Sequence, residues 1–149
     1  MFKLVVLPLD ESEISEAALP YAVSITDPHG KLVLVSAVER LGHHSTNAGL
    51  YHVPIDYGNI HENMLEHANA YLDTKLREAR QHVPASIKRV ISGEPASGII
   101  QVAEEEKAEA IVMSTHGRSG ISRWVFGSIT QKVLSAAPCP VLVVPPAKR

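Results

Sequence analysis

Residues 110–120 read Ala110-Ile111-Val112-Met113-Ser114-Thr115-His116-Gly117-Arg118-Ser119-Gly120. A short apolar run therefore passes directly into a loop rich in glycine and hydroxyl side chains. An apolar run without alternation is typical of a strand that is covered on both faces, as in a parallel sheet. Ligands of such sheets bind beyond the carboxyl ends of the strands. We therefore predict a buried parallel strand at residues 110–113, followed by a functional loop.

Four more β-rich runs lie along the chain, at residues 2–9, 31–38, 86–92 and 141–144. The segments between the five runs have apolar residues at helical spacing. Alternation of strands and helices predicts βαβ units. We expect an α/β fold with an open, doubly wound, five-stranded parallel sheet and helices on both faces, a Rossmann-like arrangement.

Apolar stripes predict which helix faces pack on the sheet. The four stripes are Ile14, Ala17, Ala18, Tyr21 and Ile25; Ile60, Met64, Ala68, Tyr71, Leu72 and Leu76; Ile99, Val102 and Ala103; and Ile129, Val133, Leu134 and Ala137. The triplet Glu104, Glu105 and Glu106 is expected to face solvent. Residues 40–58 form a long irregular stretch, which in a compact domain is usually functional or mobile.

Composition narrows the class of protein. A length of 149 residues predicts one domain over residues 1–149. A net charge of −2 and a pI near 6.4 give no general attraction to nucleic acid or to an anionic membrane. Cys139 is the only cysteine and fits a reducing compartment as a small core residue. The start of the chain resembles neither a signal peptide nor a membrane span, so we expect a cytoplasmic protein.

The loop behind Met113 has the chemistry of a phosphate site. Gly117 and Gly120 let the backbone approach an anion without a Cβ in the way. Gly127-Ser128 opens a helix, whose free N–H groups and positive dipole end favour phosphate oxygens. Further donors come from Ser114, Thr115, Ser119, Ser128 and Arg118. The same residues are also ordinary turn formers and a helix cap, so the chemistry alone supports both interpretations.

This loop resembles the nucleotide signature of the universal stress protein family, which reads glycine, two residues, glycine, nine residues, then glycine followed by Ser or Thr. Gly117 and Gly127-Ser128 match, and Ser114 stands at the first glycine position. A serine fits there if φ is negative and is strained if φ is positive. The resemblance extends to residues 6–12 and 137–145, and thus covers the whole chain.

The resemblance implies a site for ATP, with ADP or AMP as alternatives and Mg²⁺ accompanying a polyphosphate. Family members hold adenine and ribose between the first and second strand ends, which implies contacts from Pro8, Leu9, Asp10 and Ala37. The implied phosphate contacts come from Met113, Ser114, Thr115, His116, Gly117, Arg118, Ser119, Gly120, Gly127, Ser128, Ile129 and Thr130. Asp10 has a second interpretation, as the cap of the first helix with Glu13 as its capping-box partner.

Histidines cluster around residues 40–67, but His61 and His67 are six residues apart and do not share a helix face as an i, i+4 metal pair would. We expect solvated or loop-packing roles for them and no metal site. A Ser119–His116 pair shows no third group to orient it, so we assign no catalytic residues and expect at most weak ATP hydrolysis.

The run Val141–Val144 is predicted to lie at a sheet edge, where an exposed apolar strand needs a cover. Related proteins pair this strand with its copy, which implies a homodimer. The resemblance thus implies a nucleotide-binding stress-response or regulatory dimer. A slow ATPase or phosphotransfer enzyme, and a dimeric scaffold that binds no nucleotide, are the alternatives.

Overall fold

The computed structural model describes residues 1–40, 56–115 and 126–146. The elements in chain order are β1 (Phe2–Pro8), α1 (Glu13–Glu16), α2 (Leu19–Ile25), β2 (Thr26–Val38), α3 (Tyr57–Arg80), β3 (Ile87–Ser92), α4 (Pro95–Glu106), β4 (Ala110–Ser114), α5 (Ser128–Ala136) and β5 (Val141–Val144). All five strands pair in parallel, in the order β3-β2-β1-β4-β5. The predicted five-stranded parallel α/β sheet is confirmed.

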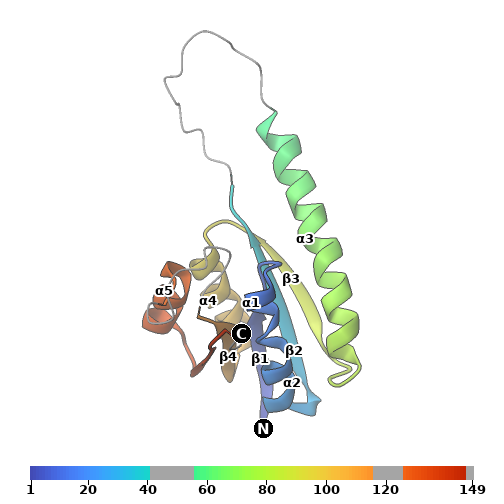
Figure 1. Cartoon of the computed structure of the whole chain (residues 1–149), viewed down its shortest axis with the longest axis vertical. Coiled ribbons are helices and arrows are strands. Elements are labelled where there is room, and N and C mark those ends of the chain that lie inside the picture. The colour runs from blue at the N-terminus through green and yellow to red at the C-terminus, as the bar shows by residue number, and fades with distance from the viewer. Residues whose placement is uncertain (41–55, 116–125, 147–149) are drawn as a thin grey trace.

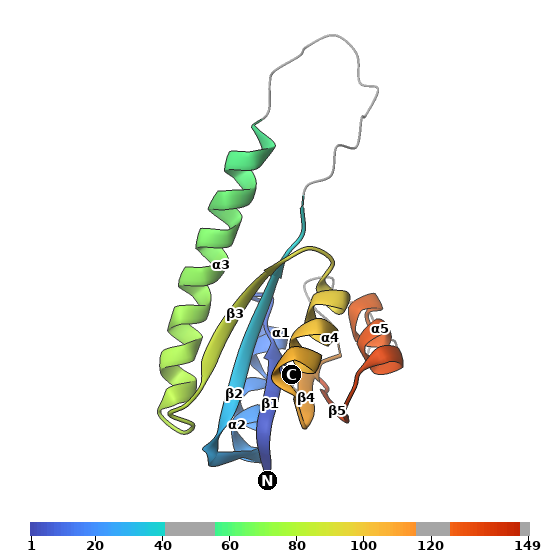
Figure 2. The same cartoon turned by 180° about the vertical axis from the view of Figure 1, so that it is seen from behind.

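Two apolar cores lie on opposite faces of the sheet. Successive residues of β1 point to opposite faces: Leu7 joins the core under α2 and α3, whereas Val6 joins the core under α4 and α5. The helices that follow β1 and β2 thus cover one face, and those that follow β3 and β4 cover the other (Figures 1 and 2). Because crossover connections are right-handed, the change of face marks the point where strand order reverses, between β1 and β4.

β2 begins five residues earlier than the apolar run predicts. Thr26 already pairs with Phe2, and the register between the strands shifts before Leu4. The backbones approach so closely that a Cβ on Gly30 would lie 2.6 Å from the carbonyl oxygen of Lys3. A strand can therefore pass through a segment with turn-like composition, because glycine stands at the close approach.

The first predicted helix is two short helices, α1 and α2. Pro20 stands in the first turn of α2, where the missing N–H of proline costs nothing. The same missing N–H cannot continue a hydrogen-bond ladder from α1, so the helix restarts. Ala18 and Ala22 are buried, but Tyr21 is exposed, so its predicted place in the core stripe is wrong.

α3 is 24 residues long, about 36 Å at 1.5 Å per residue. Its C-terminal half packs on the sheet, with Leu72 and Leu76 buried. Its N-terminal half runs on beyond the strand ends (Figure 1). There Ile60 is 38% exposed and Met64 is 41% exposed. The stripe is thus continuous in sequence, but its first two members lie outside the core, because the helix outlasts the sheet.

The face that α4 buries matches the prediction, since Ile99, Val102 and Ala103 are all buried. The prediction that Glu104, Glu105 and Glu106 all face solvent is wrong at Glu106. This residue is only partly exposed and pairs with Arg89 at 3.0 Å.

α5 buries a narrower face than predicted. Thr130 and Val133 are buried and Ala137 packs against the same core, at i, i+3, i+7 spacing. Ile129 and Leu134 are exposed, so their predicted core positions are wrong. None of the helices in the described ranges is long and apolar enough to cross a membrane.

Candidate functional site

A cavity of about 750 Å³ opens at the carboxyl end of the sheet. Its walls come from the ends of β1 and β2, the first turn of α5 and the N-terminal half of α3. A smaller pocket of about 100 Å³ adjoins it above β1, β2 and β4. Both lie where strand order reverses, which is the usual place for a ligand in an open α/β sheet.

The structure brings most of the predicted site residues together. The large cavity is lined by Asp10, Ala37, Gly127, Ser128, Ile129 and Thr130, and the small pocket adds Pro8, Leu9, Met113 and Ser114. Thr115 lines neither space, although it follows β4 directly. His116, Gly117, Arg118, Ser119 and Gly120 lie outside the described residues.

The first turn of α5 lines this cavity. Gly127 is the N-cap, with extended backbone and no side chain to satisfy the turn, and its own N–H donates to the carbonyl oxygen of Thr115 at 2.9 Å. The first N–H groups of a helix have no intrahelical partner, and the helix dipole adds positive potential. The predicted helix start at Gly127-Ser128 is therefore confirmed, next to a space that an anion can enter.

Two contacts fix α5 to the end of β4. The Thr130 hydroxyl lies within donating distance of two carbonyl oxygens, at 3.1 Å from that of Ser114 and 3.2 Å from that of Thr115. Thr130 is buried, so its hydroxyl needs an acceptor inside the protein, and these two carbonyl oxygens provide it. A threonine at this position thus holds the helix start against the strand end.

Ser114 adopts ordinary backbone geometry at the first glycine position of the signature. It is the last residue of β4, pairs with Val144 and is only 7% exposed. In the described ranges, Glu11 and Lys107 are the non-glycine residues with positive φ, so Ser114 carries no such strain. The position requires a small buried side chain, and serine supplies one.

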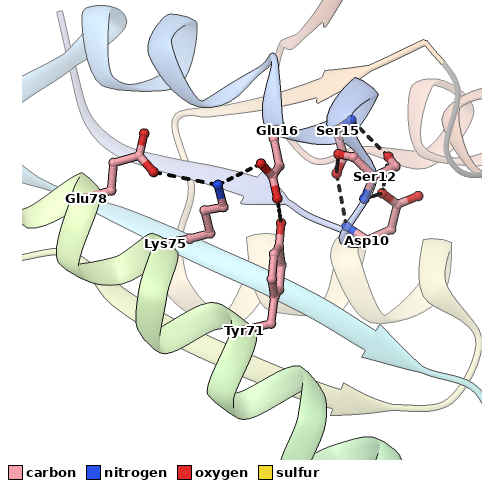
Figure 3. A network of polar contacts seen from close by, with 7 residues as sticks. All are labelled: Asp10, Ser12, Ser15, Glu16, Tyr71, Lys75 and Glu78. Carbon is pink, nitrogen blue, oxygen red and sulfur yellow. Dashed lines mark hydrogen bonds and ion pairs between the residues drawn. The ribbon is translucent and has the colours of Figure 1, made fainter.

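Asp10 supports the cap of α1 and is not the cap itself. Ser12 is the N-cap, and its hydroxyl oxygen accepts from the N–H of Ser15 at 3.0 Å. Asp10 accepts instead from the N–H of Ser12 at 3.1 Å and from its hydroxyl at 2.5 Å (Figure 3). The predicted capping box of Asp10 with Glu13 is therefore wrong, because the helix starts two residues later. These bonds orient a carboxylate that also lines the cavity.

A polar network joins α1 to α3 beside this turn (Figure 3). Glu16 accepts from the Tyr71 hydroxyl at 2.9 Å and from Lys75 Nζ at 2.7 Å. Burial, and then the hydrogen bond to the Glu16 carboxylate, raise the pKa of Tyr71. The sequence did not predict this network, because the spacing of Tyr71 places it in an apolar stripe. The i, i+4 spacing of Tyr71 and Lys75 was the available signal for a shared partner.

α3 contributes a wall of the cavity that the sequence did not predict. Ile60, Asn63, Met64, His67 and Ala68 all line it. They follow the i, i+3, i+4 spacing of one helix face, which reads equally well as a core stripe.

Both histidines on α3 contact residues at the sheet end, and the His67 side chain remains 73% exposed, in keeping with the expected solvated or loop-packing roles. His67 Nε2 lies 2.9 Å from a carboxylate oxygen of Glu11, and His61 Nε2 lies 2.9 Å from the Ser92 hydroxyl. Across the described part of the chain, no three His, Cys, Asp or Glu side chains gather as metal ligands would. The two histidines thus connect α3 to two different strand ends.

α4 meets the cavity at Pro95, directly after its cap. The Glu94 carboxylate accepts from the N–H groups of Ala96 and Ser97 at 3.1 and 2.9 Å, and from the Ser97 hydroxyl at 2.6 Å. The two Ser97 bonds lower the pKa of Glu94 to about 2. Lys132 of α5 approaches the same carboxylate at 3.5 Å. The Glu94 side chain thus caps the start of α4, whereas the start of α5 has no side-chain cap.

Charge is unevenly distributed around the large cavity. Carboxylates of Asp10, Glu11 and Glu39 lie on the side of β1 and β2, whereas the start of α5 lies on the side of β4. An anionic group is repelled by the first side and attracted by the second. The cavity therefore suits an elongated ligand with its anionic part at Gly127 and its hydroxyl groups near Asp10.

The fold is that of a doubly wound α/β protein, with a cavity at the switch point of its sheet. The chain belongs to the universal stress protein family, whose model matches residues 1–145. A universal stress protein of Thermus aquaticus is 34% identical, over 97% of this chain and 99% of its own length. One from Methanocaldococcus jannaschii is 30% identical, over 100% of this chain and 85% of its own length.

Solved structures agree on the fold. The universal stress protein UspA from Lactobacillus plantarum superposes with a TM-score of 0.77 at 23% identity, covering 95% of this chain and 97% of that one. A universal stress protein in complex with cAMP gives 0.62 at 23% identity, covering 96% of both chains. One from Archaeoglobus fulgidus in complex with dAMP gives 0.63 at 20% identity, covering 96% of this chain and 97% of that one.

Proposed function

We propose that this chain binds an adenine nucleotide in the cavity at the carboxyl end of its sheet. The observation that carries the proposal is the convergence of Asp10, Ala37 and the Gly127-Ser128 helix start on one space of about 750 Å³. A carboxylate accepts from two vicinal ribose hydroxyls, and a helix start binds phosphate oxygens. The complexes of two family members with cAMP and dAMP support an adenine nucleotide as the ligand class.

ATP is the form we assign to the site, and Mg²⁺ would accompany it. Gly117, Gly127 and Ser128 keep the spacing of the ATP signature. Ser114 supports the assignment because its backbone has the geometry of an ordinary strand end. Asp10 and Glu11 would favour a metal-neutralised polyphosphate over a bare one, since both carboxylates line the same cavity.

The nucleotide would act as a regulatory signal in a cytoplasmic stress-response dimer. β5 is the edge strand beside β4, and Leu142 is 40% exposed on it. A second copy of the chain pairing along Val141–Val144 would cover this apolar edge. Thr115 connects the two regions, since its N–H donates to the carbonyl oxygen of Val144 at 3.2 Å.

Mass spectrometry of freshly purified protein tests the assignment. The denatured protein should release an adenine nucleotide in amounts approaching one per chain, and the mass identifies ATP, ADP, AMP or a cyclic nucleotide. Added ATP should raise the melting temperature of nucleotide-free protein, because a ligand that binds only the folded state stabilises it. Absence of a released nucleotide together with an unchanged melting temperature at millimolar ATP would refute the proposal.

A further inference from the structure

The N-terminal half of α3 carries two large apolar side chains that the core leaves uncovered. Ile60 and Met64 are 38% and 41% exposed, and both line the cavity that also contains Asp10 and Gly127. They lie one helical turn apart, on the face that the buried Ala68 and Leu72 continue toward the sheet. Apolar surface in such a place gains free energy when a ligand removes it from water.

The order of the strands sets the direction in which a nucleotide would lie. The start of α5 follows β4, Asp10 follows β1 and Ala37 ends β2, and these strands are neighbours in the order β4, β1, β2. With phosphates at α5 and ribose at Asp10, the base extends past the end of β2. The reverse orientation would place phosphates beside Glu11 and Glu39, where like charges repel them.

Walls from both faces of the sheet bound the cavity. α3 covers one face and supplies Met64, while α4 covers the other and supplies Pro95. The two helices lie on opposite sides of β2 (Figures 1 and 2). The space between them suits a flat apolar group, and the purine is the flat part of a nucleotide.

Given the proposed nucleotide binding, on which this step rests, we propose that Ile60 and Met64 of α3 form the wall against which the purine base packs. The Met64 thioether would supply a polarisable contact to the aromatic ring, and Pro95 of α4 lines the same cavity. Such contacts are made to the flat faces of the base and not to the hydrogen-bonding groups at its edges. α3 therefore contributes affinity for nucleotides with an aromatic base and nothing for the phosphate chain alone.

Methionine methyl NMR tests this directly on the full chain. The chain has three methionines, so ¹³C-methyl labelling gives signals for Met1, Met64 and Met113, assigned with the Met64→Leu variant. Saturating ATP should shift the Met64 methyl upfield through the ring current of the base. Inorganic tripolyphosphate, which has no ring, should leave that signal in place. The Met1 signal serves as the internal reference, because Met1 does not line the cavity.

Affinities of variants complete the test. Met64→Ala should bind ATP about tenfold more weakly than wild type, whereas Met64→Leu should stay within about twofold. The melting temperature of nucleotide-free Met64→Ala should match wild type, since the side chain is not in the core. Suppose that wild type binds ATP, that the chemical shift of the Met64 methyl signal does not change, and that Met64→Ala binds ATP as tightly as wild type. The α3 wall is then refuted, and the proposed nucleotide site stands. If wild type binds no ATP, both proposals fall.

Discussion

The hydroxyl of Thr130, in the first turn of α5, lies 3.1 Å from the carbonyl oxygen of Ser114 at the end of β4. This bond spans the part of the chain in which the glycine-rich signature lies. It sets where the start of α5 sits relative to the strand ends. The geometry of the cavity end to which we assign the phosphates therefore depends on a buried hydroxyl that the signature does not include.

Thr130→Val should reduce both stability and ATP affinity. Valine keeps the shape of the side chain but removes the hydroxyl donor that reaches the carbonyl oxygens of Ser114 and Thr115, so the free energy of unfolding should fall by about 1 kcal/mol. Urea unfolding measures the loss, and calorimetry measures the affinity. Ser135→Ala is the control on the same helix, because its hydroxyl donates only to the exposed turn at Gln131. Unchanged stability in Thr130→Val would contradict the role of this contact.

Asp10→Ala should weaken ATP binding about tenfold or more. The carboxylate is the group we assign to the ribose hydroxyls, and hydrogen bonds to a charged group are worth about 1.5–3 kcal/mol. Asp27→Ala is a matched control, since that carboxylate accepts from the N–H of His29 at the exposed start of β2 and lines neither pocket. If Asp10→Ala and Asp27→Ala bind ATP with equal affinity, the assignment of Asp10 to the ribose hydroxyls is wrong.

Tyr71→Phe should uncouple α3 from α1. Tyr71 donates to Glu16 at 2.9 Å, so losing its hydroxyl should cost about 1 kcal/mol of unfolding free energy. In a double-mutant cycle, Glu16→Gln and Tyr71→Phe should be non-additive, because the residues are in direct contact. The variant should also lose less stability than wild type above about pH 10. The pKa of Tyr71 is raised in the folded protein, so in wild type unfolding releases its proton there. Additive effects would show that the contact contributes nothing.

Glu94→Gln should destabilise the protein in a pH-dependent way. The folded pKa of Glu94 lies near 2, below its ordinary value of 4.5, so its contribution is present above pH 4.5 and is lost as pH falls toward 2. At pH 7 we expect a loss of about 0.5–1 kcal/mol, the worth of a helix cap, because the carboxylate is 40% exposed and solvent screens its charge. Thermal unfolding from pH 7 to pH 2.5 measures the difference, which should shrink with acid. A difference that stays constant with pH would contradict the assignment.

If the chain forms the proposed dimer through β5, Leu142→Lys should convert that dimer to a monomer. A lysine on the apolar edge strand opposes pairing with a second copy, which is how natural sheets protect their edges. Light scattering coupled to gel filtration measures the mass. Leu134→Lys, at an equally exposed leucine on α5, should leave the dimer intact. A wild-type chain that is already monomeric at micromolar concentration would refute the edge-pairing proposal.

Patterns in the sequence predicted the sheet better than the helices. Continuous apolar runs located all five strands because a strand buried on both faces needs apolar side chains throughout. A helical stripe shows only that one face is apolar, and not what covers it. Ile60 and Met64 therefore read as core residues although they line the cavity, and Tyr71 read as apolar although its hydroxyl binds Glu16.

Which residues line the cavity was predictable where they follow the strand ends, and not where they depend on contacts across the chain. Asp10, Ala37 and Gly127 could be located because the fold brings carboxyl ends together. The contribution of α3 could not, since it depends on how far a 24-residue helix extends beyond the sheet. The sequence also could not show whether Ser114 fits the first glycine position of the signature. A serine fits there without strain when φ is negative, and only the structure gives the sign of φ.

Calorimetric titration of the full-length, nucleotide-free chain with ATP and Mg²⁺ is the most direct test of the nucleotide site. A cavity that joins Asp10 to the start of α5 should give one saturable site per chain, lost or strongly weakened in Asp10→Ala. Heats that never saturate, or an affinity that Asp10→Ala leaves unchanged, would show that no nucleotide binds at this edge of the sheet.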